Sequence, residues 1–220
     1  MNNALPLKVS AAIILAMIVA AIWALAVVPV DAQVAVHFNL QGEPDRFAAP
    51  LLAFSIMPAA ALFTSLVLAL APRFAHAEAS LGRSGNAYAT FWIGIMCVLL
   101  VAHIVIIASA AGVALSIPRG LTALLGLFLL ITGNVSSLIK PNRILGVRTP
   151  GTYGSDRVWA KTHRVFGWAS VLLGLGLIAL ALANAAPAVL ASATIGGIVL
   201  IGAGSVAYSY WAWRQDKTNA

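Results

Sequence analysis

Residues 121–182 read LTALLGLFLLITGNVSSLIKPNRILGVRTPGTYGSDRVWAKTHRVFGWASVLLGLGLIALAL. Two apolar runs, 121–139 and 165–182, enclose a segment that is rich in Lys, Arg, Pro and Gly. A bilayer core about 30 Å thick takes about 20 helical residues, and backbone groups in lipid must hydrogen-bond within the protein. The stretch therefore predicts two membrane-spanning helices joined by a basic loop.

The rest of the chain repeats this pattern. Of 220 residues, 61% are hydrophobic and only 9% are charged, which leaves too few polar side chains to cover a soluble globule. The apolar runs long enough to span a bilayer are 9–30, 48–71, 89–115, 121–139, 165–182 and 188–213. We therefore expect an all-α membrane protein, a bundle of six transmembrane helices. The first run exceeds the apolar core of a signal peptide, so we expect it to be retained.

The cations predict the orientation of this bundle, because cytoplasmic loops carry an excess of Lys and Arg. Only Arg46 and Arg119 fall on one side of the predicted bundle. The other side carries Lys8, Arg73, Arg83, Lys140, Arg143, Arg148, Arg157, Lys161, Arg164, Arg214 and Lys217. With an even number of spans, this bias places both termini in the cytoplasm.

The basic loop, residues 140–164, has two parts. Its first part contains Pro and Gly residues that forbid a long helix. In its second part Ser155 is a candidate N-cap, and apolar residues then recur at helical spacing, which predicts a short amphipathic interfacial helix before the fifth span. The cations either only enforce topology and bind anionic lipid, or they belong to a surface for a cytoplasmic partner. That surface would comprise Asn142, Arg148, Thr149, Trp159, Thr162, His163 and Arg164.

The loop between the first two spans, residues 31–47, is the second polar segment with candidate site residues. It contains His37, Asn39, Gly42 and Asp45, and Asn39, Gly42 and Pro44 predict tight turns. His37, Glu43 and Asp45 form a weak candidate metal set, because their spacing matches no established ligand motif. Hydrogen bonds that fold the loop onto the helix ends are the favoured interpretation, and we predict no metal and no cofactor.

His103 lies in the middle of the third predicted span. A histidine inside the bilayer is a functional candidate, although its neutral form is also stabilised by a hydrogen bond between helices. Asn134 with Ser137, and Thr132 with Ser136, form a polar stripe on the fourth span that could supply such a bond. Alternatively, His103 and Asn134 would belong to a solute pathway.

Two motifs resemble the SdpI-like bacterial membrane proteins, whose founding member confers immunity to a secreted membrane-active peptide toxin. The loop at 31–47 resembles the N-terminal domain of unknown function of that family, through His37-Phe38-Asn39, Gly42, Pro44 and Asp45. The basic loop resembles the C-terminal domain of the family. This second motif comprises Pro141-Asn142, Gly146-Val147-Arg148-Thr149-Pro150, Ser155, Val158-Trp159, Thr162-His163-Arg164 and Gly167.

The resemblance implies a multi-pass immunity and signalling protein of the bacterial cytoplasmic membrane. It implies an N-terminal half, residues 1–115, with the first motif, and an SdpI-like C-terminal half, residues 116–220, with the second. The partners it implies, besides membrane lipids, are a peptide toxin and a small cytoplasmic transcriptional repressor. We expect no direct contact with nucleic acid, and small residues in the last two spans permit a homodimer.

Two other function classes compete with immunity and signalling. One is a small-solute transporter or channel, which His103 and Asn134 would serve. The other is a membrane-embedded metal-dependent enzyme. We predict a protein that is not an enzyme, because the sequence has no nucleophile and base pair, no phosphate loop and no zinc-protease spacing.

Overall fold

The computed structural model describes residues 3–74 and 81–218. Within these residues, six helices are long and apolar enough to cross a membrane. They are α1 (Ala4–Val27), α2 (Pro50–Phe74), α4 (Gly85–Ala110), α5 (Ile117–Ser136), α7 (Asp156–Leu182) and α8 (Pro187–Thr218). The predicted six-helix membrane bundle is confirmed, and the helix ends differ from the prediction by a few residues except at the start of α7.

Local sequence explains where several helices begin. Pro50 and Pro187 are the first residues of α2 and α8, and Pro118 lies in the first turn of α5. Proline suits this position because its fixed φ is helical and its missing N–H would have no partner in the first turn. Ser155 caps α7, as its position predicts, and its Oγ accepts a hydrogen bond from the backbone N–H of Val158 at 3.3 Å.

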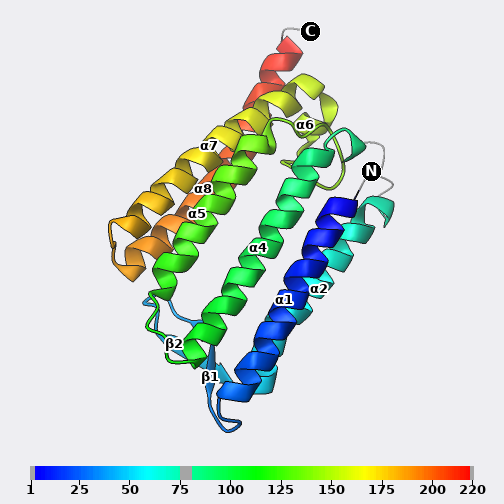
Figure 1. Cartoon of the computed structure of the whole chain (residues 1–220). Coiled ribbons are helices and arrows are strands. Elements are labelled where there is room, and N and C mark those ends of the chain that lie inside the picture. Colours follow the sequence, from blue (N-terminus) through cyan, green and yellow to red (C-terminus); the bar gives the residue numbers. More distant parts are fainter. Residues whose placement is uncertain (1–2, 75–80, 219–220) are drawn as a thin grey trace.

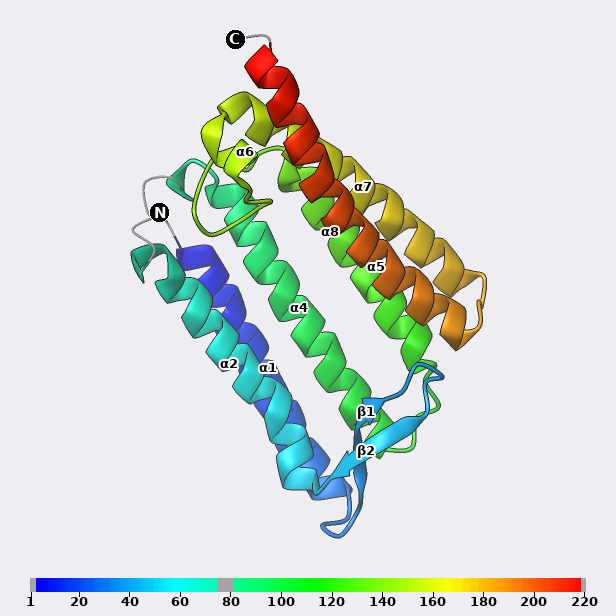
Figure 2. The same ribbon diagram turned by 180° about the vertical axis from the view of Figure 1, so that it is seen from behind.

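The helices form two groups of three (Figure 1). The first group is α1, α2 and α4, and the second is α5, α7 and α8. In the described part of the chain, α4 and α5 are the only long helices that bring the two groups into contact. We call this contact the seam. Both termini lie at one end of the bundle, the termini side, and a β-hairpin lies at the other end, the hairpin side (Figures 1 and 2).

Glycine pairs bring α5 and α7 close together. A Cβ on Gly126 would lie 2.7 Å from the carbonyl oxygen of Gly174, and one on Gly174 would lie 2.5 Å from that of Gly126. Gly133 and Gly167 form a second pair of this kind, nearer the termini side. Small residues allow this approach in a membrane, where packing rather than the hydrophobic effect holds helices together. These glycines therefore serve contacts within the chain.

The loop between α1 and α2 is a β-hairpin, which the sequence did not predict. Strands β1 (Val34–Phe38) and β2 (Pro44–Ala48) pair antiparallel, with register irregularities around His37. The turn at residues 39–42 agrees with the prediction, but Pro44 begins a strand rather than forming a turn. Pro is compatible with this place because it is the first residue of an edge strand.

The segment between α5 and α7 also differs from its prediction. The expected interfacial helix before the fifth span is not separate, because residues 156–182 form one continuous helix, α7. The turn-rich part ends instead in a short helix, α6 (Pro150–Gly154). The predicted amphipathic face is real, since Val158, Trp159 and Thr162 are buried while Lys161 is exposed, but it packs on the protein.

Candidate functional site

The candidate site comprises two polar segments at opposite ends of the seam. The hairpin, residues 34–48, lies on the hairpin side, and the connecting loop, residues 137–155, lies on the termini side (Figures 1 and 2).

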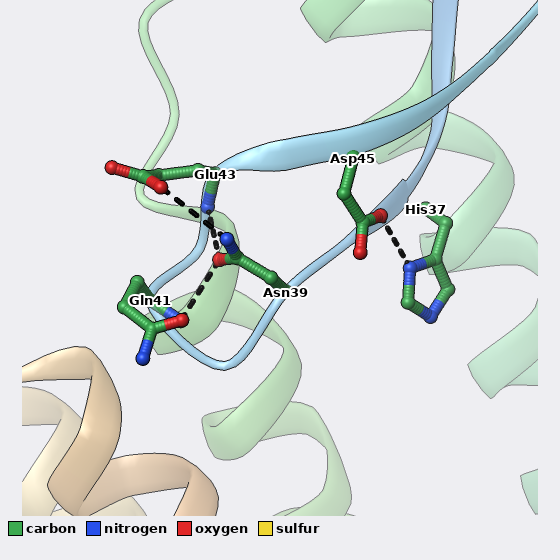
Figure 3. A network of polar contacts seen from close by, with 5 residues as sticks. All are labelled: His37, Asn39, Gln41, Glu43 and Asp45. Atoms are coloured by element: carbon green, nitrogen blue, oxygen red, sulfur yellow. Dashed lines mark hydrogen bonds and ion pairs between the residues drawn. The ribbon is translucent and has the colours of Figure 1, made fainter.

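Asn39 organises the turn of the hairpin (Figure 3). Its Oδ1 accepts hydrogen bonds from the backbone N–H groups of Gln41 and Glu43, both at 2.9 Å. Its amide nitrogen donates to Glu43 Oε2 at 3.3 Å. Asn side chains commonly bond to backbone groups two or more residues ahead, which makes the turn without further partners. The predicted role of Asn39 in a turn is therefore what the structure shows.

His37 and Asp45 join the two strands of the hairpin. His37 Nδ1 lies 2.6 Å from Asp45 Oδ1, and both side chains are exposed (Figure 3). Glu43 points to Asn39 instead of joining this pair. The weak candidate metal set His37, Glu43 and Asp45 is thus divided between two contacts, and no group of three metal-binding side chains gathers in the described residues. The geometry matches a hairpin held by hydrogen bonds.

The tip of the hairpin rests on the second helix group. Gly42 has a φ of 81°, and a Cβ there would collide with the ring of Pro118 in the first turn of α5. Glycine is required here both for the left-handed backbone and for this close approach. A cavity of about 160 Å³ lies beside this contact, between the tip and the ends of α5 and α8. A hairpin from the first helix group thereby contacts the second.

Asn142 organises the start of the connecting loop. Its Oδ1 accepts hydrogen bonds from the N–H groups of Ile144 and Leu145, at 2.8 and 2.7 Å. Its Nδ2 donates to the carbonyl oxygens of Lys140 and Leu145, at 2.8 and 3.0 Å. The side chain is 4% exposed, so all of its hydrogen-bonding capacity serves the loop itself.

His163 holds the middle of the connecting loop against α7. Its Nε2 accepts a hydrogen bond from the Val147 N–H at 3.0 Å, and its Nδ1 donates to the Trp159 carbonyl oxygen at 2.9 Å. A backbone N–H can only donate and a carbonyl can only accept, so the ring is neutral with its proton on Nδ1. The ring stacks on Trp159 at 4.3 Å between centroids. Gly146, at φ 115°, has no room for a Cβ because His163 Nε2 fills the space.

The end of the connecting loop is joined to α8. Thr149 and Thr152 form a reciprocal capping box at the start of α6, and Thr149 Oγ1 lies 2.9 Å from Ser209 Oγ of α8. Ser155 Oγ donates to Asp216 Oδ2 at 2.6 Å, and Arg157 lies 3.4 Å from the same carboxylate. The connecting loop is therefore hydrogen-bonded to α8 as well as to α7.

The connecting loop also packs on the first helix group. The Lys140 N–H donates to Ser84 Oγ, next to the start of α4, at 2.8 Å. Ile144 and Leu145 pack on the core cluster that includes Trp92 of α4. The Trp159 indole donates to the Ile139 carbonyl oxygen at 2.8 Å, and both residues pack on Ala87. The connecting loop thus closes the seam on the termini side, as the hairpin tip does on the hairpin side.

Comparison with protein-family models identifies both segments. Residues 138–210 match the SdpI/YfhL protein family, and residues 12–62 match a domain of unknown function, DUF1648. Over these two segments the chain is similar to the SdpI-like family. The predicted resemblance is confirmed, and each match contains one of the two motifs. Comparisons with curated proteins and with solved structures gave no significant match.

The SdpI-like motif of the connecting loop is mostly internal. Arg148 and Arg164 are exposed, and Arg148 donates to the Arg143 carbonyl oxygen at 2.6 Å. The other residues predicted to form the partner surface are buried: Asn142, Thr149, Trp159, Thr162 and His163. The contacts of four of them hold the loop together, whereas the Thr162 hydroxyl makes no hydrogen bond in the described structure. A partner at this side can therefore reach the arginines and their exposed neighbours. A cytoplasmic partner remains a prediction.

His103 and Asn134, the two intramembrane polar residues, lie apart in the SdpI-like bundle. His103 is buried and its Nε2 lies 3.0 Å from the Met17 carbonyl oxygen of α1, so the bond between helices exists. The polar stripe of α5 does not supply it. Thr132 donates to the Phe128 carbonyl oxygen of its own helix, and Asn134 is exposed. The two residues therefore do not form one polar pathway.

Several residues that hold these loops were missed in the sequence. Ser84, Pro118, Ser209 and Asp216 each contact a motif from a distant part of the chain. Ser84, Pro118 and Asp216 lie at or near helix ends, where such residues are ordinary, and Ser209 is an isolated serine inside the apolar helix α8. No local signal distinguishes them.

Proposed function

We propose that this SdpI-like chain is a non-enzymatic immunity and signalling protein that protects a bacterial cytoplasmic membrane against a membrane-active peptide toxin. One observation carries the proposal: each of the two family motifs closes the same seam, at opposite ends and from opposite helix groups. The hairpin motif reaches Pro118 through Gly42, and the connecting-loop motif reaches Ala87 of α4 through Trp159, next to the bond from Lys140 to Ser84. A protein that only blocked a toxin on one side of the membrane would not need contacts between the helix groups at both ends of the seam.

The hairpin supplies a surface that suits a membrane-active peptide. In the described residues both of its strands are edges, because the sheet has two strands, and β2 is exposed along most of its length. Leu40 and Phe47 are 56% and 53% exposed, next to the polar pair His37 and Asp45. An extended peptide with apolar side chains can add to such an edge through backbone hydrogen bonds.

A peptide that binds at the hairpin would change the connecting loop on the termini side, through the seam. A peptide that moves the tip off Pro118 frees one contact between the helix groups, so the groups can shift about the α4–α5 contact. The connecting loop bridges the same groups and would change with them. Its exposed arginines, Arg148 among them, are the groups that a small acidic surface of a repressor would contact. Coupling of this kind requires that both ligands favour one arrangement.

Survival of a toxin-sensitive bacterium tests the immunity function. Cells that express the chain are exposed to a panel of secreted membrane-active peptides, with empty-vector cells for comparison. We expect protection by the wild type and loss of protection by Gly42→Ala, because a Cβ at φ 81° strains the turn that presents the β2 edge to the peptide. Gln41→Ala is the matched control, since its side chain is exposed and makes no hydrogen bond in the described structure. Wild-type cells that die like empty-vector cells with every peptide would contradict the proposal.

Arg148 tests the signalling function separately. A transcriptional reporter controlled by the small repressor proposed as the cytoplasmic partner should be induced by toxin in wild-type cells and not in Arg148→Ala cells, while survival stays the same. Arg214→Ala is the matched control, because Arg214 is an exposed cation of α8 that lies outside the connecting loop. Equal induction in all three strains would remove the cytoplasmic arginines from the mechanism.

A further inference from the structure

A groove outside the two motif contacts lies between α5 and α7. It encloses about 510 Å³ and is lined by Gly133, Asn134, Ser137, Arg164, Gly167, Trp168 and Val171. Gly133 and Gly167 line the groove, and the close approach of their backbones leaves no room for a Cβ between the two helices. The groove therefore lies beside the glycine pair that packs α5 on α7.

The polar lining of this groove consists of hydrogen-bond donors. Arg164 brings a guanidinium, Asn134 an amide, Ser137 a hydroxyl and Trp168 an indole N–H. No acidic residue lines the groove. In the described structure none of these four side chains makes a hydrogen bond or an ion pair, although other polar side chains around them in the connecting loop are bonded.

The sequence around the groove predicts that it lies where headgroups meet acyl chains. Asn134 is in the last turn of α5, and Ser137 directly follows that helix. Arg164 is the last cation of α7 before the apolar run 165–182. Trp168, which is 66% exposed, is one turn further along, in the position that interfacial Trp residues occupy. The polar donors match the headgroup of a phospholipid, and the apolar Val171, further along α7, matches its acyl chains.

We propose that this groove binds an anionic phospholipid through its phosphate. The Arg164 guanidinium can donate two hydrogen bonds to phosphate oxygens, and the Asn134 amide and Ser137 hydroxyl lie on the facing helix to donate to the same group. The acyl chain then follows Val171 along α7. The site would add a polar bridge between α5 and α7 beside the contact of Gly133 with Gly167. This proposal does not depend on immunity or signalling.

Lipid selectivity tests the site. The protein is reconstituted into vesicles with phosphatidylcholine as the major and phosphatidylglycerol as the minor lipid, and the lipids that remain bound after mild detergent extraction are quantified by native mass spectrometry. We expect the wild type to retain phosphatidylglycerol in preference to phosphatidylcholine. Arg164→Gln should reduce this preference about tenfold, because it removes the charge of the guanidinium and leaves only a neutral donor for the phosphate. Lys161→Gln is the matched control, because Lys161 is an exposed cation one turn away that does not line the groove.

Asn134→Leu is a second variant that keeps every charge and removes only the amide. Its side chain is exposed and unbonded, so the fold should tolerate it, and a smaller loss of preference is expected. Equal losses for Arg164→Gln and Lys161→Gln would overturn the proposal, since they would show diffuse attraction to a basic surface. Absence of any preference in the wild type would overturn it too. Displacement of phosphatidylglycerol by inorganic phosphate alone would assign the groove to a free anion instead of a lipid.

Discussion

Single residues decide the shape of the connecting loop, and most of them act through the backbone. Asn142 bonds four backbone groups, and His163 accepts one N–H while donating to one carbonyl. Buried polar side chains of this kind are costly to remove, because their backbone partners lose a hydrogen bond without gaining water. The loop therefore depends on a few polar residues rather than on an apolar core of its own.

Gly146→Ala should destabilise the protein by about 1–3 kcal/mol, since the backbone at φ 115° is strained for any residue with a Cβ and His163 Nε2 occupies the space. Thermal unfolding in detergent measures the change. Gly154→Ala is the control, because a Cβ there meets only the Trp213 ring at an ordinary 3.7 Å. Equal melting temperatures for the two variants would mean that the loop relaxes around position 146.

At the scale of elements, α5 and α7 are held by backbone contact at two glycine pairs. Gly126→Ala should cost about 1–3 kcal/mol, because its Cβ would meet the Gly174 carbonyl oxygen at 2.7 Å and separate the helices. Gly120→Ala in the same helix is the control, with no atom near its Cβ, and should be neutral or stabilising. Unfolding of the purified protein in a denaturing detergent compares them. A neutral Gly126→Ala would show that α5 and α7 have room to move apart.

The helices, the hairpin and the connecting loop differ in how far their structure could be predicted from the sequence. Apolar runs predict the six helices because length and hydropathy alone decide a span, and Ser155 predicts the start of α7 because capping is local. The hairpin strands were missed because each has five residues and β2 is almost entirely exposed, so no buried face alternates. The burial of Asn142, Thr149 and His163 could not be predicted, since polar residues in a basic loop suggest a surface and partners such as Ser209 are distant in sequence.

For the whole molecule, the positive charges predict that the termini side faces the cytoplasm. Cysteine labelling tests this orientation in a Cys97→Ser background, because Cys97 is the single cysteine of the chain. An impermeant thiol reagent added to intact cells should label Leu40→Cys at the hairpin tip and not Lys217→Cys near the end of α8. Labelling of Lys217→Cys before lysis would reverse the orientation, and with it the sides assigned to toxin and repressor.

The crossed contacts at the seam also limit how this architecture can diversify. The hairpin lies in the N-terminal match but fits against Pro118, whereas the connecting loop begins the C-terminal match but fits against Ser84. Recombination that exchanges one whole domain between two members would therefore separate each motif from the residue that receives it. On the hairpin side the unit that can be transplanted is Gly42 together with Pro118, and on the termini side only Ser84 is constrained, because Lys140 donates through its backbone N–H. Chimaeras that keep these residues should assemble where plain domain swaps fail.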